Sequence, residues 1–200
     1  MIFITSKTSD GNMSIFCGDP TTALNNQKKF SKKLGIDYKN IIELKQIHGN
    51  RIIKIDQPTV KINRADGLIT NRPKLYLMIK AADCHQIGFY DPKNKAIGLI
   101  HAGFKGLKKG IIKKVIEKMA KFFKSDPKDL IVKLGPSIGP CCYRMDIWKK
   151  AEKQLTDCGV LEKNIGNPRI CTYESEDYFS HRRAEDKKEN DFRFMTILGL

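Results

Sequence analysis

The sequence predicts an α+β fold, in which packed mixed β-sheets are flanked by helices. Short β-like runs follow one another through the middle of the chain without regular alternation with helices. Two other segments repeat their apolar residues with the period of an amphipathic helix. The chain has 200 residues, of which 40% are hydrophobic, so it can bury a substantial core. Because no internal repeat or linker interrupts it, we expect a single domain over residues 1–200.

The first expected elements are one helix and a series of strands. Asp19 and Pro20 form a helix start signal, an N-cap followed by proline at the first helical position, and Gly35 ends the helix. Turn residues then separate several short strands. The β-like runs lie at residues 41–47, 52–55, 67–70, 75–79, 87–90 and 96–100.

The clearest helix covers residues 106–123. Its apolar positions recur every three or four residues, and six lysines occupy the opposite face. A strand at residues 130–134 and a Pro- and Gly-rich loop at residues 135–140 follow it. The remaining expected elements are a helix at residues 146–157, strands at residues 169–173 and 192–198, and a helical turn around residues 175–182.

The charge of the chain is strongly positive, with 37 basic and 22 acidic residues and a net charge of +15. Nucleic-acid binding is one interpretation. However, 29 of the basic residues are lysines spread along the chain, whereas base and phosphate recognition favours the planar fork of arginine. We therefore interpret the charge as a solvated surface that attracts anionic substrates, and keep a nucleic-acid-binding module as a less favoured alternative.

Apolar stretches of only four or five residues predict that no segment spans a membrane. The N-terminal residues lack the pattern of a signal peptide, so a cytoplasmic location is expected. None of the six cysteines forms a CxxC pair, which argues against a zinc ribbon, and most are expected to be buried thiols. The oligomeric state is left open.

Three residues with metal-binding chemistry, His48, Cys84 and His101, lie at the ends of expected strands. Two imidazoles and a thiolate are a three-ligand set suited to Zn²⁺, and they leave one position for a substrate or water. Separations of 36 and 17 residues carry little information by themselves. The residues alone therefore leave open a plainer alternative, in which both histidines are hydrogen-bonded strand ends and Cys84 belongs to the core.

Ordered motifs add to this evidence from about residue 40 to the C-terminus. The sequence resembles the YfiH family, also called the laccase-domain or multicopper polyphenol oxidase family. The motifs that carry the resemblance are QIHG at residues 46–49, ADGLIT at 65–70, ADC at 82–84, HAGFKG at 101–106, GPSIGPCCY at 135–143, CTY at 171–173 and FSHRR at 179–183.

The resemblance implies a fold like that of YfiH and the cytotoxic necrotizing factor deamidases. It also implies that His48, Cys84 and His101 bind zinc, rather than copper, at a catalytic site. The implied activity is phosphorolysis of adenosine, inosine and methylthioadenosine, with adenosine deamination as a further reaction. The substrates would then be a nucleoside and phosphate, and Cys84 would belong to the catalytic group.

Further roles are assigned to other residues within or next to these motifs. Asp83 is the candidate acid that moves protons during deamination, although its place on the strand turns it away from Cys84. We assign Lys105, Arg182 and Arg183 to phosphate, with ordinary surface charge as the alternative for each. Lys105 replaces the family's arginine and lacks its bidentate fork. The extra imidazole of His85 is expected to point to the opposite face of its strand.

Two other classes of enzyme remain as alternatives. In a thiol hydrolase, Cys84 would be the nucleophile and His101 the base; this class includes the family's other label, an editing amidase for peptidoglycan precursors. Polyphenol oxidation by copper is disfavoured, because a multicopper site needs many imidazoles and the chain has four histidines.

Overall fold

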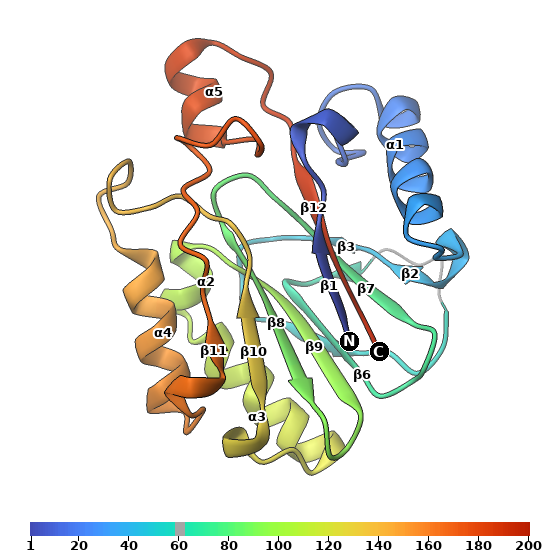
Figure 1. Ribbon diagram of the computed structural model, residues 1–200, viewed down its shortest axis with the longest axis vertical. Helices are drawn as coiled ribbons and strands as arrows, with labels where there is room; N and C mark the ends of the chain where they lie inside the picture. The colour runs from blue at the N-terminus through green and yellow to red at the C-terminus, as the bar shows by residue number, and fades with distance from the viewer. Residues whose placement is uncertain (59–62) are drawn as a thin grey trace.

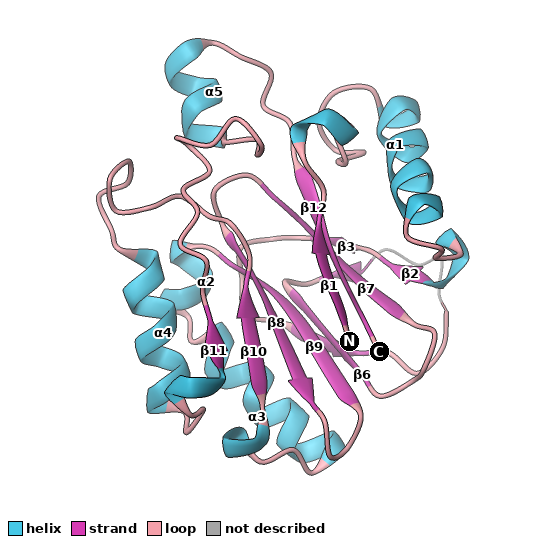
Figure 2. Ribbon diagram, viewed as in Figure 1, coloured by secondary structure: helices cyan, strands magenta, loops and turns pink. Residues whose placement is uncertain are grey.

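Two mixed β-sheets pack face to face in the computed structural model, and helices cover both outer faces (Figures 1 and 2). The structure describes residues 1–58 and 63–200. The four-stranded sheet has the order β1-β12-β7-β2, the six-stranded sheet has the order β11-β10-β8-β9-β6-β4, and β3 pairs with β5. Both large sheets contain parallel and antiparallel neighbours. The predicted α+β class with mixed sheets is therefore confirmed.

The strands are short and follow the apolar runs of the sequence. Their bounds are β1 Ile2–Thr5, β2 Ile41–Ile42, β3 Leu44–Lys45, β4 Ile52–Lys54, β5 Asn63–Arg64, β6 Gly67–Thr70, β7 Tyr76–Ala81, β8 His85–Asp91, β9 Ala96–Ala102, β10 Ile131–Leu134, β11 Ile165–Gly166 and β12 Phe194–Gly199. The α-helices are α1 Pro20–Lys33, α2 Phe104–Lys108, α3 Ile111–Phe123, α4 Ile147–Asp157 and α5 His181–Lys187. Single 3₁₀ turns occupy Thr8–Asp10, Tyr38–Asn40, Pro127–Asp129 and Glu162–Asn164.

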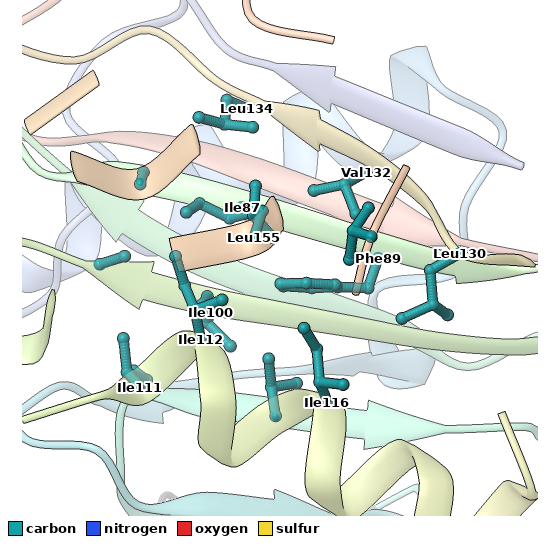
Figure 3. Close-up of a cluster of buried hydrophobic side chains, with 14 of the residues drawn as sticks. Ile87, Phe89, Ile100, Ile111, Ile112, Ile116, Leu130, Val132, Leu134 and Leu155 are labelled. Atoms are coloured by element: carbon teal, nitrogen blue, oxygen red, sulfur yellow. The ribbon is translucent and has the colours of Figure 1, made fainter. Parts of the chain in front are cut away.

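Side chains alternate between the two faces of β7, so one face packs against the other sheet and the opposite face packs against a helix. Leu77 and Ile79 pack with Leu99 of β9 in the cluster between the two sheets. Met78, on the opposite face of β7, packs with Phe30 of α1. A third and larger cluster lies between the six-stranded sheet and α3 and α4, and Figure 3 shows it. In the described part of the chain, no helix is both long and apolar enough to cross a membrane.

Most expected elements are present, and α1 begins as its start signal predicts, with the Asp19 carboxylate accepting a hydrogen bond from the Thr22 amide at 2.7 Å. The single helix expected at residues 106–123 is wrong. Two helices replace it, because Gly110 adopts a left-handed backbone conformation with φ of 70° between α2 and α3.

The strand expected at residues 169–173 is also wrong, since this segment makes only an isolated bridge from Cys171 to Ser137. The expected helical turn is displaced to α5, which Ser180 caps by accepting a hydrogen bond from the Arg183 amide. The strand at residues 192–198 is confirmed as β12, and β1, for which we had no expectation, pairs along its edge.

Candidate metal centre

The structure brings His48, Cys84 and His101 together, with one ligand atom of each lying within 4.8 Å of the other two. His48 lies in the loop after β3, Cys84 immediately before β8, and His101 within β9. The two imidazole rings meet edge to face, with centroids 4.8 Å apart. Pairing of β8 with β9 sets Cys84 beside Gly103, where any side chain would collide with the cysteine sulfur.

Asp66, at the start of β6, organises two of these three residues. Its carboxylate accepts hydrogen bonds from the backbone amides of His48 and Gly49 at 2.9 and 2.7 Å, and thereby fixes the loop that carries His48. The same carboxylate lies 3.1 Å from Nδ1 of His101. This contact leaves Nε2 of His101 free to bind a metal, as in many carboxylate–histidine–metal sites.

Asp66 is fully buried, and burial alone would raise its pKa. The hydrogen bonds from His101 and from the backbone amides outweigh burial, so the pKa of Asp66 is lowered and it remains a carboxylate. Asp66 was assigned no role from the sequence, although it belongs to the ADGLIT motif. A signal was present, because an aspartate directly before a short and largely apolar strand needs several hydrogen-bond donors when it is buried.

Ionisation of Cys84 is coupled to the two histidines. Burial disfavours the thiolate, but the neighbouring imidazoles of His101 and His48 outweigh it and lower the pKa of Cys84 to about 6. Burial likewise disfavours the imidazolium of His101, but the Cys84 thiolate and the Asp66 carboxylate raise its pKa to about 9. The site therefore favours a thiolate at neutral pH, which is the form that binds metals.

These residues fit a metal ion of intermediate softness. Two imidazole nitrogens and a thiolate converge, and Asp66 fixes the orientation of one ring. Three protein ligands leave a fourth position open, which is typical of a catalytic rather than a structural site.

The three ligands line a pocket of about 480 Å³, which is large enough for a nucleoside-sized molecule. Aromatic rings of Phe16, Phe104 and Tyr143 also line it, and basic groups contribute from the C-terminal segment. Arg182 and Arg193 are two of these basic groups. The pocket thus combines a metal site, apolar rings and positive charge.

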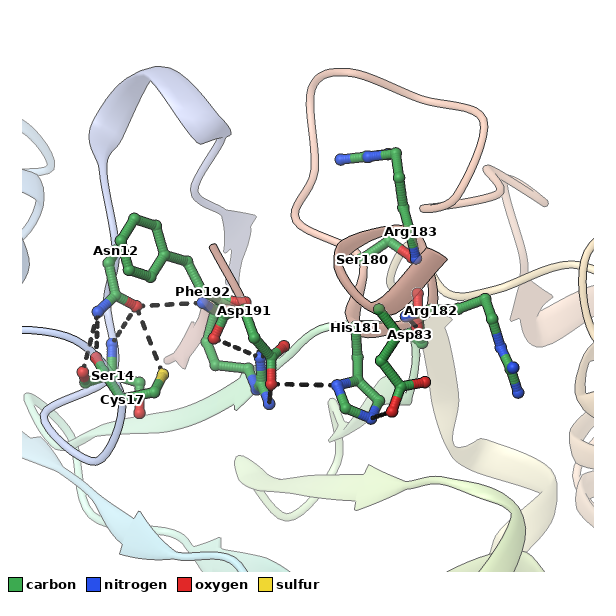
Figure 4. Close-up of polar contacts among 12 residues, drawn as sticks. Asn12, Ser14, Cys17, Asp83, Ser180, His181, Arg182, Arg183, Asp191 and Phe192 are labelled. Atoms are coloured by element: carbon green, nitrogen blue, oxygen red, sulfur yellow. Dashed lines mark hydrogen bonds and ion pairs between the residues drawn. The ribbon is translucent and has the colours of Figure 1, made fainter. Parts of the chain in front are cut away.

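The N-terminal wall of the pocket is held by Asn12, as Figure 4 shows. Its side-chain amide donates to the carbonyl oxygens of Ser14 and Cys17, while its side-chain oxygen accepts from the amides of Ser14 and Arg193. This clamp joins the loop that presents Phe16 to the segment before β12. Asn12 had no predicted role from the sequence.

Asp83 lines the pocket, but both of its carboxylate oxygens already accept hydrogen bonds. Oδ1 accepts from the Thr172 hydroxyl and Oδ2 from the Arg182 amide, both at 2.7 Å. The residue has φ of 81°, so its backbone lies in the left-handed region between β7 and β8. The structure therefore gives Asp83 a clear structural contact with the segment that begins α5.

The three cations assigned to phosphate have different positions. Arg182 lines the pocket, whereas Lys105 is exposed on α2 and lies outside the pocket lining. Arg183 also lies outside the lining, and its guanidinium donates to four backbone carbonyl oxygens at 2.7–3.1 Å. These are the carbonyls of Thr172, Tyr173, Ser175 and Tyr178.

His85 points away from the metal ligands, as alternation along the strand predicts. Its ring lies 3.3 Å from the carbonyl oxygen of Gly135 and 3.2 Å from the hydroxyl of Ser137. Burial lowers the pKa of His85 to about 4, so the ring is neutral. It supports the loop after β10 and lies outside the pocket lining.

Comparisons with known proteins identify the family of this chain. The family model described as "Multi-copper polyphenol oxidoreductase laccase" matches residues 4–146 and 143–199. The protein of Bacillus subtilis called purine nucleoside phosphorylase YlmD is 27% identical over 88% of this chain and 76% of its own length. A purine nucleoside phosphorylase of Borreliella burgdorferi is 31% identical over 75% of this chain and 77% of its own.

Two solved structures have the same fold. The Bacillus licheniformis hypothetical protein YfiH and YlmD from Geobacillus stearothermophilus each superpose with a TM-score of 0.88 at 26% identity. Each alignment covers 94% of this chain, together with 85% of the first structure and 84% of the second.

Proposed function

This chain belongs to the family described as multi-copper polyphenol oxidoreductase laccase, and from that premise we propose that it is a zinc-dependent purine nucleoside phosphorylase. Its relatives from Bacillus subtilis and Borreliella burgdorferi carry the name purine nucleoside phosphorylase. The proposed substrates are adenosine, inosine or methylthioadenosine, together with phosphate. The observation that carries the proposal is the presence of His48, Cys84 and His101 in one pocket with aromatic rings and two arginines.

The proposed binding mode follows from what lines the pocket. A purine is flat and apolar on its faces, and aromatic side chains such as Phe16, Phe104 and Tyr143 bind such faces by stacking. Arg182 is the proposed phosphate-binding cation, since its amide is fixed by Asp83 and its side chain borders the pocket. Lys105 and Arg183 have no place in this binding mode, because they lie outside the pocket lining.

Phosphorolysis joins a phosphate oxygen to the anomeric carbon of the ribose and breaks the bond from that carbon to the purine nitrogen. The protein accelerates such a reaction by holding the two reactants in line and excluding water. Zn²⁺ bound by His48, Cys84 and His101 would supply Lewis-acid stabilisation of the developing negative charge. Asp66 would keep the ring of His101 and the loop of His48 in place throughout.

Adenosine deamination is the proposed secondary activity. It replaces the purine amine with a water-derived oxygen, so it requires a proton donor for the departing ammonia. Both oxygens of Asp83 accept hydrogen bonds from Thr172 and Arg182, which supports a positioning role rather than proton transfer.

A second candidate function, a metal-independent thiol hydrolase, is favoured by one specific observation. Cys84, His101 and Asp66 form a series of nucleophile, base and orienting carboxylate. A lowered thiol pKa beside an imidazole is typical of a cysteine nucleophile. Dependence on metal separates the two candidates, because a chelator that removes the ion would leave a thiol hydrolase active.

The proposal is tested by incubating metal-analysed protein with adenosine, with and without phosphate, and separating the products by chromatography. Adenine that forms only with phosphate, and not after treatment with a chelator, supports zinc-dependent phosphorolysis. Inosine formed without phosphate supports deamination. A zinc-loaded protein that yields neither product contradicts the proposal and favours the thiol hydrolase.

A further inference from the structure

A second group of cysteines converges outside the nucleoside-sized pocket. Cys141 and Cys142 follow the Pro- and Gly-rich loop after β10, and Cys171 comes from the segment that precedes α5. Their three sulfur atoms all lie within 4.8 Å of one another, although some 30 residues separate the two segments in the sequence. We call these three residues the cysteine cluster. None of them lines the pocket that contains His48, Cys84 and His101.

Backbone contacts hold the two segments of the cysteine cluster together. Ser137 and Cys171 form a parallel bridge, in which the Ser137 amide donates to Ile170 at 3.1 Å and the Thr172 amide donates to Ser137 at 3.2 Å. The amide of Cys142 closes a turn on the Gly139 carbonyl oxygen at 3.1 Å. The sulfur atoms are therefore brought together by structure that does not depend on the side chains themselves.

The spacing of the sulfurs fits a bound ion better than a disulfide bond. All six cysteines are free, and Sγ of Cys142 lies 3.4 Å from Sγ of Cys141, whereas a disulfide requires about 2.0 Å. Zinc–sulfur bonds of about 2.3 Å in a tetrahedral site place neighbouring sulfurs about 3.8 Å apart. The sulfurs of Cys141 and Cys142 are about 0.4 Å closer than this spacing, and no sulfur of the cluster is more than 4.8 Å from another, so small side-chain rotations would bring all three to one ion.

The surroundings of the cysteine cluster favour a cation. The Gly139 amide donates to Sγ of Cys171 at 3.2 Å, a contact that stabilises negative charge on this sulfur. A carboxylate oxygen of Glu174 also lies 3.8 Å from Sγ of Cys142.

We propose that Cys141, Cys142 and Cys171 bind a second, structural cation of the thiophilic d¹⁰ class, Zn²⁺ or Cu⁺. Three thiolates are the ligand set that such ions prefer. Glu174 is placed to complete four-coordination for Zn²⁺, whereas Cu⁺ would be held by the three sulfurs alone.

An ion bound at this site would affect one wall of the neighbouring nucleoside-sized pocket. Ile138, within the Pro- and Gly-rich loop, and Tyr143, directly after Cys142, both line it. An ion bound by the cysteine cluster would join this loop to the Cys171 segment and so fix one wall of the pocket. The cation would then stabilise the folded chain without touching the substrate.

Counting bound metal in the full-length chain tests the proposal independently of any catalytic activity. The reduced, metal-stripped protein is reconstituted with Zn²⁺ alone or Cu⁺ alone, desalted and analysed for metal. The wild-type chain is expected to bind two ions, and Cys141→Ser and Cys171→Ser one each. His48→Ala should also bind one ion. The matched control is Cys158→Ser, at a half-buried cysteine directly after the last residue of α4. This variant should bind two ions.

Two further measurements keep the result clear if a variant folds poorly. Alkylation followed by mass spectrometry should show that reconstitution of His48→Ala protects Cys141, Cys142 and Cys171, but not Cys158. Glu174→Gln should weaken Zn²⁺ binding and leave Cu⁺ binding unchanged, because Glu174 is proposed to complete the coordination of Zn²⁺ only. Unchanged Zn²⁺ binding in this variant would instead assign three-sulfur coordination to both ions. A wild-type chain that binds one ion, which His48→Ala abolishes, overturns the proposal, as does alkylation of all three thiols in the loaded protein.

Discussion

Asp66 lies 3.1 Å from Nδ1 of His101, and this buried contact links a strand of the six-stranded sheet to the candidate metal centre. Because the same carboxylate also accepts the amides of the His48 loop, one residue orients two ligands that are far apart in sequence. The site therefore depends on a residue that does not itself bind the metal.

Substitution of Asp66 tests this dependence. In Asp66→Asn, an NH₂ group replaces one of the two carboxylate oxygens, and it cannot accept the hydrogen bond that this oxygen received from the His48 loop. We expect metal affinity to fall about 10- to 100-fold, measured by competition with a chelator of known affinity. Asp91→Asn is the matched control, because Asp91 is also buried but ends β8, where its carboxylate accepts a hydrogen bond from the turn that leads to β9. Metal affinity should be unchanged in this variant.

The proposed binding mode predicts different effects of Arg182 and Lys105 substitutions on phosphate binding. Arg182→Ala should raise the KM for phosphate about 10- to 100-fold, since it removes the proposed charge-assisted hydrogen bond from Arg182 to phosphate in the pocket. Lys105→Ala should leave this KM within about twofold, because Lys105 is exposed outside the pocket lining. Steady-state kinetics at varied phosphate measures both, and the opposite order of effects would contradict the proposed binding mode.

Phe16 is 50% exposed at the edge of the pocket, so its contribution to folding is small and its contribution to nucleoside binding can be measured separately. Phe16→Ala should raise the KM for the nucleoside about tenfold, through lost stacking on the purine. Phe122→Ala removes a ring of similar exposure on α3, away from the pocket, and should not change this KM. Equal effects of the two substitutions would argue against stacking on Phe16.

Arg183 should matter for stability. Its guanidinium satisfies four backbone carbonyl oxygens in the segment before α5, and its side chain is only 12% exposed. Arg183→Ala should therefore lower the free energy of unfolding by about 2–4 kcal/mol, measured by urea denaturation. Arg144→Ala, at a position without such a cage among the described contacts, should change it by less than about 0.5 kcal/mol. An Arg183 variant as stable as the wild type would contradict the structural role.

The sequence could predict the fold class and the main elements because these follow from local patterns. Asp19 and Pro20 marked the beginning of α1, and apolar runs marked the strands that form both sheets. The break at Gly110 was missed because the apolar period continues across it, although the backbone does not. Cys171 was predicted to lie in a strand because its neighbours are β-like residues. In the structure, its segment forms only an isolated bridge to Ser137.

The three residues that converge at the candidate metal centre could be proposed from their chemistry and from family motifs. The residues that position them could not, because their roles depend on contacts between distant segments. Asp66 acts on a loop 17–19 residues earlier, and Asn12 joins its loop to Arg193, 181 residues away. Likewise, nothing local distinguishes Arg182, which lines the pocket, from Arg183, whose hydrogen bonds to backbone carbonyls become apparent only in the folded chain.

The central claim, that His48, Cys84 and His101 hold the metal on which phosphorolysis depends, is tested most directly by comparing wild-type and Cys84→Ala protein in one assay. Bound zinc and phosphate-dependent release of adenine from adenosine are measured on the same samples, with Cys158→Ser as the control. We expect Cys84→Ala to lose both the zinc of this centre and the release of adenine, while the control keeps both. A Cys84→Ala protein that retains this zinc and remains fully active would contradict the assignment.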